Sequence, residues 1–144
     1  NIVELAHKDD WIIGTGGADL KKSTSRGTLI YAMKVTEKLR LLDYKKDRRF
    51  RNRIDAHETN RARRRFALVS NHFFYFGKEA KQIPKGMKAV LEKKGPKYKT
   101  IVDPIEIGLI LKWIKKLPRG KRGDPKWEHP TYKQKAASKQ KECV

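Results

Sequence analysis

The sequence predicts an α+β protein with a small mixed or antiparallel sheet, flanked by two to three helices. Three observations support this class: several short runs rich in β-forming residues, glycine-containing turns that close them, and one late segment with helical spacing of apolar residues. The length of 144 residues and a hydrophobic content of 38% suit one domain with a modest core. We place this domain at residues 1–118 and expect residues 119–144 to form a basic, mostly exposed tail.

The first two strands are expected at residues 10–14 and 27–36. The earlier run, DWIIG, is short, apolar and followed by a glycine-rich turn. In the later run, period-two spacing places Leu29, Tyr31, Met33 and Val35 on one face. We expect these strands to pair, with residues 18–26 as an exposed polar loop.

A helix and a basic connection are expected next. Leu39 and Leu42 recur at helical spacing, and Thr36 can cap the first turn, so the pattern predicts a short helix from residue 36 to about residue 47. Residues 48–65 contain eight arginines, almost no apolar residues and no periodicity. This composition indicates a connection that stays flexible until it meets a partner.

The second half of the chain supplies further strands and the clearest helix. The β-rich runs at residues 66–70 and 72–76 form either one kinked strand or two strands. A weak helix is expected at residues 86–94. A longer helix is predicted at residues 104–117. Asp103 provides an acidic cap before it, and a proline occupies the first helical position. Apolar residues follow at four-residue steps, namely Ile105, Leu109, Trp113 and Leu117.

The charge of the chain points to an anionic partner. The formal net charge is +20, and residues 61–144 carry 23 basic and 7 acidic side chains of the total. Such an excess concentrates polyanions, of which nucleic acid is the commonest in a cell. The lone cysteine, Cys143, allows neither an internal disulfide nor a cysteine-based zinc site. No apolar run is long enough to span a bilayer, so we expect a cytoplasmic protein with no membrane partner.

The glycine-rich turn at residues 14–17 invites comparison with phosphate-binding loops. It lacks the glycine directly before the lysine of a Walker motif, and Asp19 stands where a dinucleotide motif needs its third glycine. A hairpin turn is therefore the simpler interpretation. Exposed amides and nearby cations would still allow phosphate contacts, and the residues we select for this role are Thr15, Gly16, Lys21, Lys22 and Arg26.

Three polar residues in a row, Ser70, Asn71 and His72, are the main candidates for chemistry. A Ser-His nucleophile pair needs a third group to orient the imidazole, and the sequence singles out none, so a structural or ligand-contacting turn is the alternative. Asp10 is a further weak candidate for proton transfer beside Ser70 and His72. The histidines lack metal-ligand spacing, so we assign no metal and no cofactor.

Aromatic and arginine side chains suggest how a nucleic acid is held. Rings in the β-rich segments can stack on bases while lysine and arginine neutralise phosphates. Because alternation separates the rings of residues 73 and 75 from those of residues 74 and 76, one pair is available for a ligand. We select Trp11, His72 and Tyr75 to face a base, with Asn71 beside them, and Arg61, Arg63 and Arg64 to bind phosphate.

With these residues in view, the chain resembles a family, the second type of nucleotide-modification-associated domain, found in bacteria and their phages. The matching segments are DWIIGTG at residues 10–16, GTLIYAMKVTE at 27–37, SNHFFYFG at 70–77, and the stretch 113–125 with LPRG and GDP. The resemblance implies association with systems that modify DNA bases. By analogy it also implies a small barrel like that of PUA, ASCH and EVE domains, toward which the sheet would curl.

The function we expect is therefore that of a nucleic-acid-binding or nucleotide-binding domain in a DNA base-modification system, which recognises a base or modified nucleotide in a cleft. Other components of such a system are expected partners. Two alternatives stay open: an enzyme acting on a base or nucleotide, and a basic structural protein that binds nucleic acid without preference.

Overall fold

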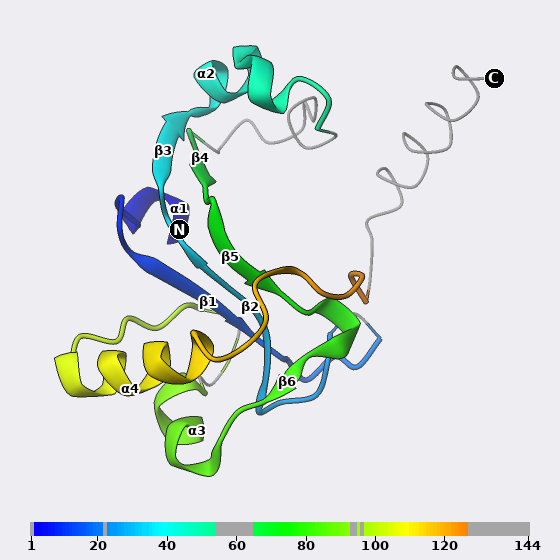
Figure 1. Ribbon diagram of the computed structural model, residues 1–144, viewed down its shortest axis with the longest axis vertical. Coiled ribbons are helices and arrows are strands. Elements are labelled where there is room, and N and C mark those ends of the chain that lie inside the picture. Colours follow the sequence, from blue (N-terminus) through cyan, green and yellow to red (C-terminus); the bar gives the residue numbers. More distant parts are fainter. Residues whose placement is uncertain (1, 22, 54–64, 93–94, 96, 127–144) are drawn as a thin grey trace.

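The computed structural model of the chain describes residues 2–21, 23–53, 65–92, 95 and 97–126 (Figure 1). Strands and helices are both present, so the predicted α+β class is confirmed. In chain order the elements are α1 (Ile2–Leu5), β1 (Trp11–Thr15), β2 (Thr28–Lys34), β3 (Glu37–Arg40), α2 (Leu41–Lys46), the 3-10 helix η1 (Arg48–Phe50), β4 (Phe66–Val69), β5 (His72–Tyr75), the 3-10 helix η3 (Gly77–Glu79), β6 (Lys81–Gln82), α3 (Lys85–Leu91), α4 (Pro104–Ile114) and β7 (Gly120–Lys121).

The main sheet is mixed and open. Its strands lie in the order β1-β2-β5-β7, and β6 also pairs with β2. The β1/β2, β2/β5 and β2/β6 pairs are antiparallel, as expected for the first two strands, whereas β5 and β7 are parallel. Among the described strands, the outer pair β1 and β7 are not joined, so no closed barrel forms and the curl toward a PUA-like barrel is unconfirmed.

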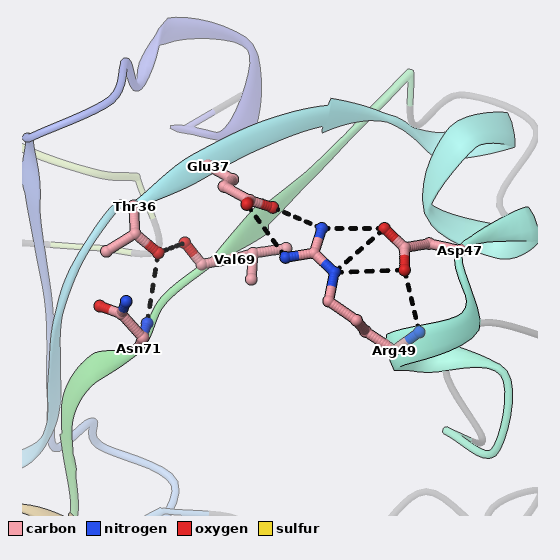
Figure 2. Close-up of polar contacts among 6 residues, drawn as sticks. All are labelled: Thr36, Glu37, Asp47, Arg49, Val69 and Asn71. Atoms are coloured by element: carbon pink, nitrogen blue, oxygen red, sulfur yellow. Dashed lines mark hydrogen bonds and ion pairs between the residues drawn. The ribbon is translucent and has the colours of Figure 1, made fainter.

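Two strands continue beyond the sheet as a bent ribbon. Lys34 pairs with His72 in the sheet and Glu37 pairs with Val69 in the second ladder, β3/β4, and both pairs have the same register. The runs at residues 66–76 are thus two strands of one ribbon, separated by residues 70–71, and this ribbon rises toward α2 in Figure 1. At the bend, the Thr36 hydroxyl donates to the Val69 carbonyl and accepts from the Asn71 amide (Figure 2).

The helix predicted from residue 36 to about residue 47 is wrong in its first half. Residues 37–40 form β3, because each of them finds a partner in β4; Leu39, for example, lies opposite Ala67. Tertiary pairing overrides the weak helical spacing of Leu39 and Leu42. Thr36 does not cap a helix, because its hydroxyl group bonds to Val69 across the bend of the ribbon. The helix α2 begins only at Leu41.

The main core lies between one face of the sheet and the helices α3 and α4. Strands β2 and β5 contribute Leu29, Ala32 and Phe74, which are at most 1% exposed, and α4 contributes Ile110 and Ile114. Leu29 and Ala32 share this face although they are three residues apart, because the β1/β2 register shifts between Gly14 and Thr15. The prediction that Leu29 lies on one face with Tyr31, Met33 and Val35 is therefore wrong for Leu29. Phe74 and Phe76 are both buried, so the predicted division of the four aromatic residues between the two faces is confirmed.

The opposite face of the sheet is covered by the N-terminal residues. Ala6, Ile12 and Val35 form a second, smaller buried cluster there. The Lys38 ammonium group donates to the carbonyl oxygens of Glu4 and Ala6, both at 2.8 Å, and so holds the end of α1 against the ribbon.

The late helix α4 begins as the sequence predicts. The Asp103 carboxylate accepts a hydrogen bond from the Ile105 amide at 2.9 Å, and Pro104 occupies the first turn. The predicted apolar face is narrower in the structure, because Ile105 is 74% exposed and Leu109 is 55% exposed. No helix in the described part of the chain has the length and apolar character needed to cross a membrane.

Residues 119–126, which we expected in an exposed tail, contain the last strand of the sheet. Gly120 pairs with Phe74, and the Arg122 amide donates to the Tyr75 carbonyl at 2.7 Å. The chain then lies against the end of β5, where the Lys78 amide donates to the Asp124 carbonyl at 2.8 Å. Gly77 has a positive φ of 55° and leaves no room for a Cβ beside that carbonyl, which explains glycine at this position. Residues 127–144 of the expected tail lie outside the described residues.

Candidate functional site

Two of the residues selected to face a base, Trp11 and His72, lie together on the α4 side of the sheet. Both are cross-strand neighbours of Lys34, from β1 and β5 respectively. Their ring centroids are 5.1 Å apart and the rings meet edge to face. Phe74 lies beneath them, 6.3 Å from the Trp11 ring and 5.7 Å from the His72 ring. The buried phenyl ring thus supports two half-buried rings.

Cations from three separate segments lie close enough to His72 to affect its charge. Lys34 comes from β2, Lys115 ends α4, and Arg119 precedes β7. Partial burial and then the positive charges of Arg119, Lys115 and Lys34 lower the pKa of His72 below its usual value. We call the surface made by these five residues the His72 face: Trp11, Lys34, His72, Lys115 and Arg119.

Few acidic groups offset the charge of the His72 face. Lys34 lies 3.5 Å from the Asp9 carboxylate, which is 69% exposed and so screened by water. Arg119 donates to the Asn71 carbonyl at 3.4 Å, a contact that orients the guanidinium group without neutralising it. The surface therefore combines aromatic rings with a positive potential, the combination that suits bases and phosphates.

The sequence pointed to Trp11 and His72 but missed the three cations of the His72 face. Cross-strand neighbours point to the same face of a sheet, so the side chain of Lys34 lies on the same face as that of His72. Knowing that β2 pairs with β5 in this register would have predicted this. Lys115 and Arg119 belong to the stretch at residues 113–125 that carries the family resemblance, and this was the available signal.

Tyr75 lies on the other side of the sheet from Trp11 and His72. It is three residues from His72 in the same strand, so the pleat directs the two side chains to opposite faces. Tyr75 instead faces the same side as Phe73, which is 38% exposed. The structure does not bring the three selected rings into one pocket.

The glycine-rich turn uses its amides internally. The Gly16 amide donates to the Thr28 carbonyl at 2.8 Å, and the Gly17 amide donates to the Ser23 hydroxyl at 2.9 Å. These two donors are therefore not offered to phosphate, which agrees with a structural turn. Lys21 and Arg26 are exposed on the loop that follows, and the side chain of Thr15 is half-buried. Lys22 lies outside the described residues.

The start of the arginine-rich segment is built into the fold. The Arg49 guanidinium lies between two carboxylates and donates to Glu37 at 2.8 and 3.0 Å and to Asp47 at 2.8 and 3.2 Å (Figure 2). Hydrogen bonds to Arg49 lower the pKa of both carboxyl groups. Arg49 thus fixes η1 against β3 rather than serving as a free phosphate contact. Arg61, Arg63 and Arg64 lie outside the described residues.

Ser70 and Asp10, which were predicted as weak candidates for catalysis, make hydrogen bonds that stabilise local structure. The Ser70 hydroxyl donates to the His72 carbonyl at 2.8 Å and accepts from the His72 amide at 3.1 Å, so it closes its own turn and does not contact the imidazole. Asp10 accepts from the His7 amide at 2.8 Å. The main chain of Asn71 bonds to Thr36 and Arg119. The described part of the chain brings no cluster of three or more His, Cys, Asp or Glu residues together that could hold a metal.

A groove runs along the outer edge of β1. Its volume is about 740 Å³, and all five residues of β1 line it, together with α1, the end of α3, residues 98–101 and α4. Most of the lining side chains are aliphatic. Trp11 and Thr15 are the selected binding residues that line it, and Asp10 lies at its end, whereas His72 and the cations around it do not line it.

Comparison with known proteins identifies the family. A family model described as nucleotide modification associated domain 2 matches residues 1–67 and 55–133, which together cover most of the chain. No curated protein and no solved structure matches the chain. The matched region includes every residue of the His72 face. The chain belongs to the nucleotide modification associated domain 2 family.

Proposed function

We propose that the protein is a nucleic-acid-binding domain of a DNA base-modification system and that the His72 face is its contact surface. In this proposal Trp11 and His72 lie against a base or modified nucleotide, while Lys34, Lys115 and Arg119 bind the neighbouring phosphates. The single observation that carries the proposal is the gathering of three cations from distant segments around two half-buried rings.

The energetics favour a ligand that carries both rings and negative charge. Stacking of a base on an aromatic side chain contributes about 1–3 kcal/mol, with little dependence on the base. Cations that neutralise phosphates release counterions, and that term depends steeply on salt. Burial lowers the pKa of His72, and the positive charges of Arg119, Lys115 and Lys34 lower it further. A bound anion would offset the repulsion from these charges.

Other parts of the chain extend the proposed interface. Lys21 and Arg26 on the exposed loop remain predicted phosphate contacts, as do Lys22, Arg61, Arg63 and Arg64. The net charge of +20 supports a long polyanion as the ligand. The proposal places the protein in the cytoplasm, beside other components of the modification system.

The first test measures how single cations affect binding of a fluorescent single-stranded oligonucleotide across a salt series. If Arg119 contacts one phosphate, Arg119→Ala lowers the slope of log affinity against log salt by about 0.7. Lys85→Ala is the matched control, because Lys85 is exposed at the start of α3 and away from the His72 face. Equal effects of the two substitutions would show that charge acts nonspecifically and would refute the proposed surface.

The second test examines the rings. Trp11→Ala should weaken binding by about 1–3 kcal/mol at high salt, where phosphate contacts contribute least. Trp11 also packs against the main core, so the thermal midpoint of the variant must be measured alongside. His72→Ala offers a second variant with a smaller loss of packing, and unchanged affinity in both variants would remove the rings from the interface.

A further inference from the structure

We propose that the open edge of β1 binds an extended polypeptide segment by strand addition, in the groove between α1 and the segment 98–101 with α4. This site shares Trp11 with the proposed nucleic-acid surface and is otherwise built from different residues. It uses the main chain of β1, whereas the His72 face uses side chains, so either proposal can fail without the other.

The hydrogen-bond pattern shows which main-chain groups of β1 face outward. The Val35 amide donates to the Asp10 carbonyl, and the Gly16 amide donates to the Thr28 carbonyl, both at 2.8 Å. From Trp11 to Gly14 the register with β2 is regular and the bonds alternate, so Ile12 and Gly14 also face β2. The register shifts between Gly14 and Thr15, and the Gly16 bond shows that the even-numbered residues still face β2 beyond the shift. Trp11, Ile13 and Thr15 therefore direct their N–H and C=O groups away from the sheet. Within the described residues these outward groups have no hydrogen-bond partner.

The sequence of β1 lacks two features that keep edge strands unpaired, namely charged residues and proline, although its register with β2 shifts between Gly14 and Thr15. Such strands are usually protected by charged side chains, proline or a covering segment. β1 reads WIIGT, with no charge and no proline. In Figure 1 it is the outermost strand on its side of the sheet. A hydrophobic strand of this kind is a template for pairing with another chain.

The groove also supplies places for the side chains of an added strand. Side chains of such a strand alternate between two sides. One wall of the groove carries Leu5, which is 56% exposed, and the other carries Tyr98, which is 45% exposed. Both walls are mostly apolar, so they match alternate apolar residues of a peptide.

The charge of the groove favours a polypeptide over a nucleic acid. Its charged side chains are Asp9, Asp10 and Lys99, so the groove is not positive although the whole chain carries +20. A phosphate backbone would gain nothing here and would meet two carboxylates. The occupant that these observations select is an extended segment of low charge with alternating apolar residues.

The test uses amide hydrogen exchange of the full-length, ¹⁵N-labelled protein, followed by NMR. In the free protein we expect slow exchange at Ile12 and Gly14 and fast exchange at Trp11 and Ile13. The probe is the acetylated and amidated peptide Lys-Val-Thr-Val-Thr-Val-Lys at millimolar concentration. Binding by strand addition slows exchange at Trp11 and Ile13 at least tenfold. The same peptide with N-methyl groups on two consecutive central residues, which blocks both of its edges, should have no such effect.

Two variants separate the groove from general adsorption. Leu5→Lys places a charge on the groove wall and should weaken peptide binding roughly tenfold. Leu42→Lys is the matched control, because Leu42 is 70% exposed on α2 and does not line the groove. Four results would overturn the proposal: protection of Trp11 and Ile13 in the free protein, no protection with the peptide, equal protection by the methylated peptide, or protection by single-stranded DNA instead.

Discussion

Replacing Gly16 by alanine separates a structural turn from a phosphate-binding loop at residues 14–17. A Cβ at Gly16 would lie 2.5 Å from the Thr28 hydroxyl oxygen, 0.9 Å short of the 3.4 Å at which ordinary contact begins. It would also overlap the carbonyl oxygen of Ser25, which is main chain and has no side-chain freedom with which to move away. The base of the loop must therefore open to accept the methyl group.

The expected cost follows from these contacts. Overpacking of a closely packed site costs about 1–3 kcal/mol. Opening the loop also weakens the hydrogen bond from the Gly16 amide to the Thr28 carbonyl, which contributes about 0.5–1.5 kcal/mol. We expect Gly16→Ala to lower the free energy of unfolding by about 2–4 kcal/mol. For a chain of this length that corresponds to a fall of roughly 10 °C in the thermal midpoint.

Gly17→Ala is the matched control, measured by the same urea and thermal denaturation. A Cβ at Gly17 would lie 3.7 Å from the Ser23 hydroxyl oxygen, an ordinary contact, and Gly17 does not have a positive φ. Alanine should therefore leave stability within about 1 kcal/mol of the wild type. Equal destabilisation by both variants would refute the steric argument. A stable Gly16→Ala protein with weakened DNA binding would restore the phosphate-loop interpretation.

Further predictions concern charged groups. Arg49 lowers the pKa of Glu37 and of Asp47 in the folded protein, below the ordinary pKa values of 4.5 and 3.8. The contribution of these ion pairs to the free energy of unfolding is therefore fully present above pH 4.5 and is lost as the pH falls through the lowered pKa values. Arg49→Met should reduce the urea midpoint at pH 7 but not near pH 2, whereas Arg48→Met should change neither midpoint. The pKa of His72 is lowered in the folded protein, whereas in the unfolded chain it has its ordinary value of 6.5. The unfolded chain therefore binds the proton first, and the free energy of unfolding should fall as the pH drops below 6.5. Because bound phosphate favours the charged imidazole, DNA affinity should rise over the same range, and His72→Gln should flatten both profiles; a profile unchanged by His72→Gln would contradict this assignment.

Local signals in the sequence were enough to predict β1, β2 and the start of α4. Strong β-formers beside glycine turns and the cap formed by Asp103 and Pro104 need no distant partner to be recognised. The strand at residues 37–40 and the strand β7 were missed, because their only evidence is pairing with distant residues. Tyr75 was grouped with His72 although alternation along one strand already separates them.

In the candidate site, too, some residues could be recognised from the local sequence and others only from contacts between distant segments. Trp11 and His72 stand out in the sequence because aromatic and imidazole groups are few. Lys115 and Arg119 do not, because they are two among 36 basic residues, and only the folding of α4 and β7 against β5 brings them to His72. The opposite error concerns Arg49. Its segment is rich in arginine and was predicted to supply free phosphate contacts, but Arg49 is bound by the carboxylates of Glu37 and Asp47.

The most direct test of the central claim is equilibrium binding to matched single- and double-stranded DNA and RNA, with and without modified bases, across a salt series. We predict a preference among these ligands that persists at high salt and disappears in Trp11→Ala and His72→Ala. A steep salt dependence with no preference, unchanged in both variants, would contradict the claim, because counterion release alone would then account for binding.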